Sequence, residues 1–157
     1  MIFLKLIRKA LCFFVLLCST QIFAVESTTS SVVTQPSLDL LVLMQKRLDL
    51  MHEVARVKWN RNLPVEDIVR EQEILTGLVG LGLKEGLDEK WTTRFFQAQF
   101  EAAKEVQRND FTLWTRDGVL EFENVLSLQD LRLQIDQINQ EIISLLGDIC
   151  IEDRENF

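Results

Sequence analysis

The sequence predicts an all-α protein, an antiparallel helical bundle. Apolar residues recur at intervals of three and four in several segments between residues 37 and 147, which is the spacing of one helix face. Residues typical of helix caps and turns separate these segments. No stretch after the first 24 residues has the alternating pattern of a strand. Helices with one apolar face bury it against one another, so a bundle is expected.

The first 24 residues have the pattern of a secretory signal peptide. Lys5, Arg8 and Lys9 form a basic start, an apolar run follows, and Ala24 offers a small residue before a cleavage point. The apolar run is too short for a membrane span, so we expect no membrane association after cleavage. The sequence therefore predicts an exported protein, periplasmic or secreted, with a flexible leader at 25–36 and one domain at 37–157.

The charge balance argues against a nucleic-acid partner. The whole chain has 17 basic and 24 acidic residues, and three of the basic ones lie in the predicted signal peptide. The mature chain would then hold 14 basic against 24 acidic residues, a net charge of −10. Such a surface repels DNA and RNA.

The cysteine and histidine content predicts neither a disulfide nor a metal site. Cys12 and Cys18 would leave with the signal peptide, so Cys150 would be the single cysteine of the mature chain. We expect Cys150 to be a half-buried, inert thiol rather than an intermolecular bridge. The chain has one histidine and no Cys/His cluster, so we expect no metal and no cofactor.

Four helices are expected in order along the domain. The first runs from Ser37, a plausible N-cap, to near Asn60, and the second starts with Pro64 in its first turn. The third is capped by Asp88 and covers 89 to about 114. The last follows a capping box of Ser127 with the aspartate three residues later, and ends at residue 147. Glycines at 77, 80, 82 and 86 are interpreted as a frayed helix end and a loop.

Polar residues interrupt the apolar faces of these helices. The eleven-residue step from Arg47 to Lys58 returns to within about 20° of the same helix face. Two cations on a buried face are costly unless an anion meets them. That anion could be internal or a ligand. Further interruptions on the other helices are Arg70, Gln107 and Arg132.

Each interruption alone is explained by a surface or snorkelling side chain, and Arg70 by a local ion pair with Asp67. Taken together, they could converge on one cavity that holds a small dicarboxylate, since arginine forks bind carboxylates. His52 is interpreted as an ordinary helix-surface residue. Motifs for a serine or cysteine nucleophile are absent from the sequence, so an enzyme of this kind would act by binding and electrostatics.

Three segments carry a resemblance to a known family. The run RLDLMHEVARVKWNRNLPVEDIVRE (47–71), with FFQAQFEAAKEVQ (95–107) and LRLQIDQINQEI (131–142), resembles the all-helical chorismate mutases. It is most similar to their exported class, in which a single chain supplies the whole active site. The resemblance implies a small-molecule substrate, chorismate, rearranged to prephenate by a non-covalent [3,3] shift without a cofactor. It leaves a homodimer open.

The resemblance also implies a role for each matching residue. Arg47 and Arg132 are expected to hold the two substrate carboxylates, and Lys58 and Gln107 to act as catalytic donors to the ether oxygen of the breaking bond. The remaining expected substrate-binding residues are Asp67 near Lys58 and the substrate hydroxyl, its helix partner Arg70, Glu71 at the hydroxyl, and Ala103 in the pocket wall. Two alternatives stay open: a non-catalytic exported binding protein of the same fold, and an isochorismate pyruvate lyase.

Overall fold

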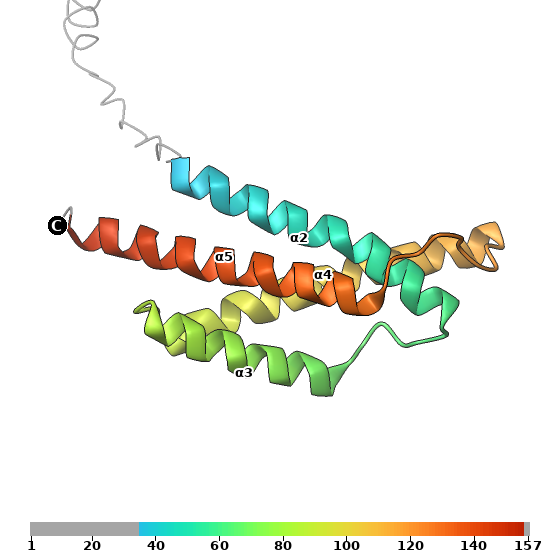
Figure 1. Ribbon diagram of the computed structural model, residues 1–157, viewed down its shortest axis with the longest axis horizontal. Helices are drawn as coiled ribbons and strands as arrows, with labels where there is room; N and C mark the ends of the chain where they lie inside the picture. The colour runs from blue at the N-terminus through green and yellow to red at the C-terminus, as the bar shows by residue number, and fades with distance from the viewer. Residues whose placement is uncertain (1–34, 156–157) are drawn as a thin grey trace, which may run out of the picture. The chain divides into compact units, whose positions relative to one another are not determined.

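The computed structural model describes residues 35–155. The predicted signal peptide and most of the predicted leader lie outside these residues. The described part is all-helical, which confirms the predicted fold class: α2 (Gln35–Asn60), α3 (Ile68–Lys84), α4 (Glu89–Asp117) and α5 (Leu128–Glu155). Successive helices alternate in direction along the chain, so they form an antiparallel bundle (Figure 1).

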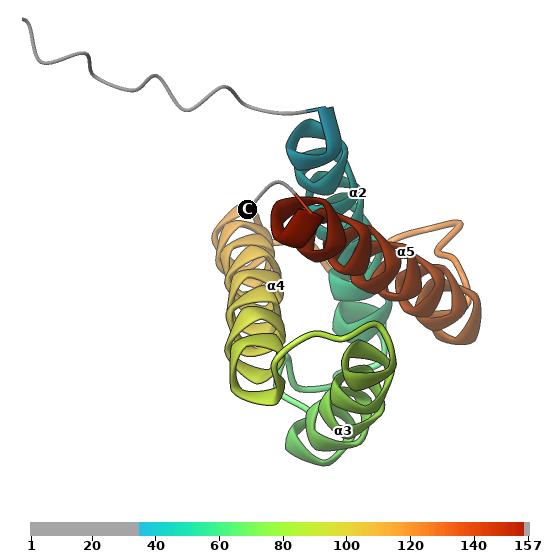
Figure 2. The same cartoon turned by 90° about the vertical axis from the view of Figure 1, so that its left-hand side faces the viewer.

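Viewed end-on, the four helices are arranged around a common centre (Figure 2). Helix α2 contacts α4 and α5, and α3 also contacts α4 and α5, whereas α2 and α3 lie across from each other. A residue on the inner face of any helix can therefore approach residues from the other three. This arrangement lets segments far apart in the sequence contribute to one site.

Two buried apolar clusters hold the bundle together. The first joins α3, α4 and α5 around Phe96 and Ile142, both fully buried. The second joins α2, α4 and α5 around Val57 and Leu131, which are also fully buried. Removing each such side chain from water contributes about 1.5–3 kcal/mol. The two clusters fix the helices on both sides of the site described below.

Helix α3 starts later than predicted. Pro64 does not begin it; residues 61–67 form a connecting segment, and the helix begins at Ile68. The carboxylate of Asp67 accepts a hydrogen bond from the Arg70 backbone N–H at 3.2 Å, which makes Asp67 the N-cap. Aspartate satisfies an otherwise unpaired amide at this position, and proline cannot. The predicted start was therefore wrong by about one turn.

The glycines do not fray helix α3. Gly77, Gly80 and Gly82 all lie within it, and the loop that follows contains only Gly86 of the four, in a left-handed conformation with φ 76°. Buried Leu75 and Leu78 anchor this helix to the first cluster, and their burial outweighs the roughly 1 kcal/mol that each helical glycine costs.

The last helix also continues beyond its predicted end. Ser127 caps it as expected, since its Oγ accepts from the Gln129 backbone N–H at 3.2 Å. Gly147 does not end it: α5 runs on to Glu155. A Cβ at Gly147 would lie 3.0 Å from the Glu85 Cβ, so the glycine allows two segments to approach closely instead of stopping the helix.

Candidate functional site

A pocket with an accessible volume of about 110 Å³ lies among the four helices. One water needs about 10–15 Å³ of accessible volume, so this pocket is large enough for a small organic molecule. Side chains from α2, the α2–α3 connection, α3, α4 and α5 line it. They include all eight residues that the sequence singled out: Arg47, Lys58, Asp67, Arg70, Glu71, Ala103, Gln107 and Arg132.

The lining has an excess of positive charge. Five of its side chains are cationic and three are carboxylates, which leaves a net charge of +2 with all groups ionised. The whole chain, in contrast, has a net charge of −7. The five cations are Arg47, Lys58, Arg70, Lys104 and Arg132, and the three carboxylates are Asp67, Glu71 and Asp136. A site of this composition is suited to a small dianion.

Arg47 is the most deeply buried of the cations, at 3% exposure. Its Nε donates to Asn139 Oδ1 at 3.0 Å and its Nη1 donates to the Gln99 main-chain oxygen at 3.1 Å. The guanidinium also lies 5.7 Å from the centre of the Phe100 ring. Burial lowers the pKa of Arg47 to about 10, so the group still carries its charge at neutral pH.

Lys58 enters the pocket from the last turn of α2. It is 9% exposed, and its Nζ donates to the main-chain oxygen of Val65 in the α2–α3 connection at 2.6 Å. Burial lowers the pKa of Lys58, nearby Asp67 opposes this effect, and Arg132 adds to it. The ammonium therefore has a fixed position and is poorly solvated, which strengthens its interaction with any negative charge in the pocket.

Gln107 lies on the inner face of α4, and it is 4% exposed. Its Nε2 donates to the Ala103 main-chain oxygen at 3.0 Å, one helical turn back, and lies 3.8 Å from the Met51 sulfur. An amide nitrogen has two N–H groups, and the second donates only to the Met51 sulfur, a weak acceptor that a ligand oxygen could replace. Ala103 is itself buried and forms a smooth part of the wall.

The remaining cations are paired with carboxylates at the rim. Arg132 Nη2 lies 3.6 Å from Asp67 Oδ2, and both side chains are almost half exposed. Arg70 Nη2 lies 3.5 Å from Asp136 Oδ2 on α5. The local ion pair expected between Arg70 and Asp67 has a different form, because Asp67 binds the Arg70 backbone and the guanidinium pairs with Asp136 and Glu73.

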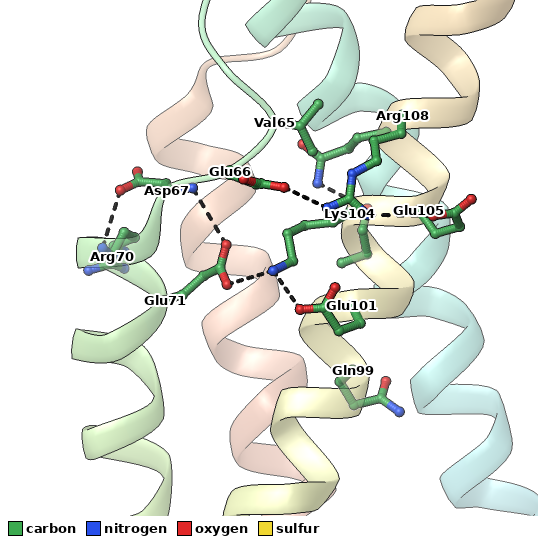
Figure 3. Close-up of polar contacts among 12 residues, drawn as sticks. Val65, Glu66, Asp67, Arg70, Glu71, Gln99, Glu101, Lys104, Glu105 and Arg108 are labelled. Atoms are coloured by element: carbon green, nitrogen blue, oxygen red, sulfur yellow. Dashed lines mark hydrogen bonds and ion pairs between the residues drawn. The ribbon is translucent and has the colours of Figure 1, made fainter.

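Glu71 is held by a lysine that the sequence analysis did not single out. Lys104 Nζ lies 3.1 Å from Glu71 Oε2 and 2.6 Å from Glu101 Oε1, and Glu71 Oε1 accepts weakly from the Asp67 N–H at 3.5 Å (Figure 3). These carboxylates raise the pKa of Lys104. Lys104 lies three residues before Gln107, so it shares the inner side of α4, and this spacing could have identified it.

A second missed contributor is Asn139, which supports Arg47 from behind the pocket wall. It follows Arg132 by seven residues, so two helical turns place both on one side of α5. Of the other expectations, His52 has an exposed side chain, as predicted, but its Nδ1 also lies 2.7 Å from buried Asp110 Oδ2 and links α2 to α4. Cys150 is half-buried and free.

Among the side chains that the structure describes, in residues 35–151, no group of three or more His, Cys, Asp or Glu is placed to hold a metal ion. None of the four helices combines the length and apolar character that a membrane span requires.

The sequence comparisons with known proteins agree in matching chorismate mutases. The family model described as chorismate mutase type II matches residues 37–108. The secreted chorismate mutase of Mycobacterium tuberculosis is 26% identical over 111 residues, covering 71% of this chain and 56% of that protein. The chain thus spans just over half the length of this relative. The monofunctional chorismate mutase of Enterobacter agglomerans is 25% identical over 152 residues, covering 90% of this chain and 82% of the relative.

The fold comparison agrees with the sequence comparison. The crystal structure of chorismate mutase from Burkholderia thailandensis superposes with a TM-score of 0.69 and 27% sequence identity. The match covers 74% of this chain and 73% of that one, so it extends over most of the four-helix bundle.

Proposed function

The chain belongs to the type II chorismate mutase family, and from this premise we propose that its pocket converts chorismate to prephenate. The reaction is a unimolecular [3,3] rearrangement in which a C–O bond breaks while a C–C bond forms. The observation that carries the proposal is the net charge of +2 in the pocket lining of an acidic protein. This lining matches a substrate with two carboxylates, and it draws its cations from all four helices.

Binding both carboxylates supplies the first part of the rate acceleration. In the proposed complex, Arg47 holds one carboxylate from α2 and Arg132 holds the other from α5. Chorismate is flexible, and its reactive form is the compact one in which the two carbons that will bond lie close together. Fixing both ends in that form removes conformational freedom before the chemical step, and this lowers the entropic part of the barrier.

Two donors supply the second part. As the C–O bond breaks, negative charge develops on the ether oxygen, and Lys58 and Gln107 are proposed to donate hydrogen bonds to it. Both are buried and are held by main-chain oxygens, so little reorganisation is needed during the reaction. Fixed donors in a poorly solvated site stabilise this developing charge more than they stabilise the ground state.

The carboxylates of the site have a supporting role in this proposal. Asp67 and Glu71 lie beside the cations, and either can accept a hydrogen bond from the substrate hydroxyl. Lys104 holds Glu71 in place, and Arg70 connects the start of α3 to Asp136 on α5. We also propose that residues 1–24 direct export, which agrees with the similarity of this chain to the secreted chorismate mutase of M. tuberculosis.

The direct test is to incubate the purified protein with chorismate and identify the product by chromatography. Conversion of chorismate to prephenate supports the proposal. A parallel incubation with isochorismate tests the lyase alternative, which predicts release of pyruvate without formation of prephenate from chorismate. A binding protein would turn over neither compound, and either of these two results would refute the mutase assignment.

A variant of Lys58 connects the activity to the pocket. We expect Lys58→Ala to reduce kcat by about 10²–10³-fold, the usual effect of removing one fixed donor, with unchanged helical content by circular dichroism. Lys46→Ala is the matched control, because Lys46 is an exposed lysine on the same helix. Burial lowers the pKa of Lys58 from the ordinary lysine value of 10.5. As the pH rises, wild-type activity should therefore begin to decline before pH 10.5 is reached, because Lys58 loses its proton. Near-normal turnover in Lys58→Ala would contradict the proposed mechanism.

A further inference from the structure

The buried cation Arg47 is held by neutral groups alone. Its hydrogen-bond partners are the side-chain amide of Asn139 on α5 and a main-chain oxygen on α4. Among the side chains that the structure describes, in residues 35–151, no carboxylate lies at ion-pair distance from its guanidinium. The exposed or half-exposed arginines of the pocket differ, since Arg70 pairs with Asp136 and Arg132 pairs with Asp67.

This neutral arrangement does not serve stability. Burial lowers the pKa of Arg47 to about 10, so the protein holds a poorly solvated charge without an internal counterion. Asn139 is 1% exposed and its Nδ2 has no hydrogen-bond partner. Gln99, whose main-chain oxygen accepts from Arg47, also has a buried side-chain Oε1 without a partner. Buried polar atoms without partners are unfavourable, and a buried arginine is ordinarily paired with a carboxylate.

We propose that Asn139 is a positioning residue, which orients Arg47 while leaving its positive charge uncompensated for a carboxylate of the substrate. The inference rests on the proposed function, in which Arg47 binds one end of chorismate. An aspartate has the same shape as asparagine and would accept the same hydrogen bond from Nε. It would also neutralise the guanidinium, and the substrate carboxylate would then compete with an internal anion of full charge.

The test is Asn139→Asp, with Gln140→Glu as the matched control. Gln140 is the next residue on α5, it is exposed, and it does not contact Arg47, so the control adds the same charge elsewhere. We expect Asn139→Asp to raise KM for chorismate at least about tenfold, because the substrate carboxylate must compete with the aspartate for Arg47, while Gln140→Glu leaves KM unchanged. The variant's kcat should fall by a smaller factor, because the bound substrate is held less firmly in its compact form. The melting temperature should stay equal or rise.

A purely structural role predicts a different pattern, in which Asn139→Asp lowers the melting temperature and leaves KM unchanged. That result would overturn the proposal. A variant that fails to fold would overturn it as well, because an aspartate paired with Arg47 should support the fold at least as well as asparagine does.

A double-mutant cycle with Arg47→Gln makes the test independent of turnover. With Arg47 present, aspartate at position 139 should be neutral or stabilising; with Arg47→Gln, the same aspartate is buried without a cation and should lower the melting temperature. Equal effects in both backgrounds would overturn the proposal. If the wild-type protein does not turn over chorismate, the proposed function fails, while the cycle still decides whether Asn139 controls the charge balance of Arg47.

Discussion

Changing Gln107 to glutamate should make the activity of this protein depend on acid. The amide of Gln107 can donate a hydrogen bond at any pH, because it does not titrate in the accessible range. A glutamate of the same length donates only when its carboxyl is protonated. The ionised form would instead repel the negative charge that develops on the ether oxygen in the proposed transition state.

The structure indicates how far the pKa of this glutamate would move. Gln107 is 4% exposed, and its Nε2 donates to the Ala103 main-chain oxygen at 3.0 Å. A glutamate at this position could donate to that oxygen only when its carboxyl is protonated. Both effects raise the pKa above the ordinary value of about 4.3, and full burial can shift a carboxyl by about 3–5 units. Lys58 in the same pocket opposes them. We therefore expect the pKa of the glutamate in the variant to lie above its ordinary value, because burial outweighs the attraction of Lys58.

The assay is kcat as a function of pH for the wild type and for two variants. Gln107→Glu should approach wild-type turnover at acidic pH and lose about tenfold per pH unit above its raised pKa. Gln107→Met, which has a similar length but no donor, should be slow at every pH. The folded pKa of the glutamate exceeds the unfolded one, so the variant should also lose stability as pH rises from the unfolded to the folded pKa, by about 1.4 kcal/mol for each unit between them. Parallel wild-type and Gln107→Glu profiles would refute a contact between Gln107 and the ether oxygen.

Two further predictions concern the supports of the site. Lys104→Met should lower kcat/KM about tenfold and stability by about 1 kcal/mol, because Glu71 loses its partner at 3.1 Å. Lys104→Arg should recover most of the lost activity and stability. Equal activity in the wild type and both variants would contradict a role of Lys104 in holding Glu71. In calorimetry, Gly80→Ala should stabilise α3 by about 0.5–1 kcal/mol, since nothing lies within 4 Å of its Cβ. Gly82→Ala should destabilise the protein by about 1–3 kcal/mol, because the added Cβ would lie 3.0 Å from Cγ2 of buried Thr92, whose hydroxyl donates to the Asp88 main-chain oxygen. An increase in stability for both alanine variants would contradict this close approach.

The fold, and the helix face on which each site residue lies, could be predicted from the sequence because both depend on helical periodicity. Arg47 and Lys58 break an apolar face at a spacing that returns to the same side of α2, and the same reasoning places Gln107 inward on α4. Their meeting in one pocket depends on the packing of all four helices. That convergence was inferred from the joint pattern and from family resemblance, since periodicity alone places residues on faces but does not bring the faces together.

The differences between prediction and structure have two physical origins. At Pro64 a local signal predicts the wrong helix start, because the Asp67 cap sets the start of α3 four residues later. At Gly147 and at the glycines of α3, packing keeps the helix intact: α5 passes close to Glu85, and two buried leucines hold α3 past Gly77. Lys104 was missed because a lysine on a helix is usually solvated, and its pairing with Glu71 requires α3 and α4 to lie side by side.

The charge distribution implies that this site captures its ligand at short range. The chain as a whole has a net charge of −7, so a dianion far from the pocket meets weak repulsion. At physiological ionic strength the screening length is about 8 Å, which confines the effect of exposed charges to their surroundings. Arg47 and Lys58 are buried, so solvent ions screen them least, and their attraction acts on a ligand that has already entered. Binding strength should therefore come from the buried cations and from the neutral groups that hold them, more than from long-range steering by the surface.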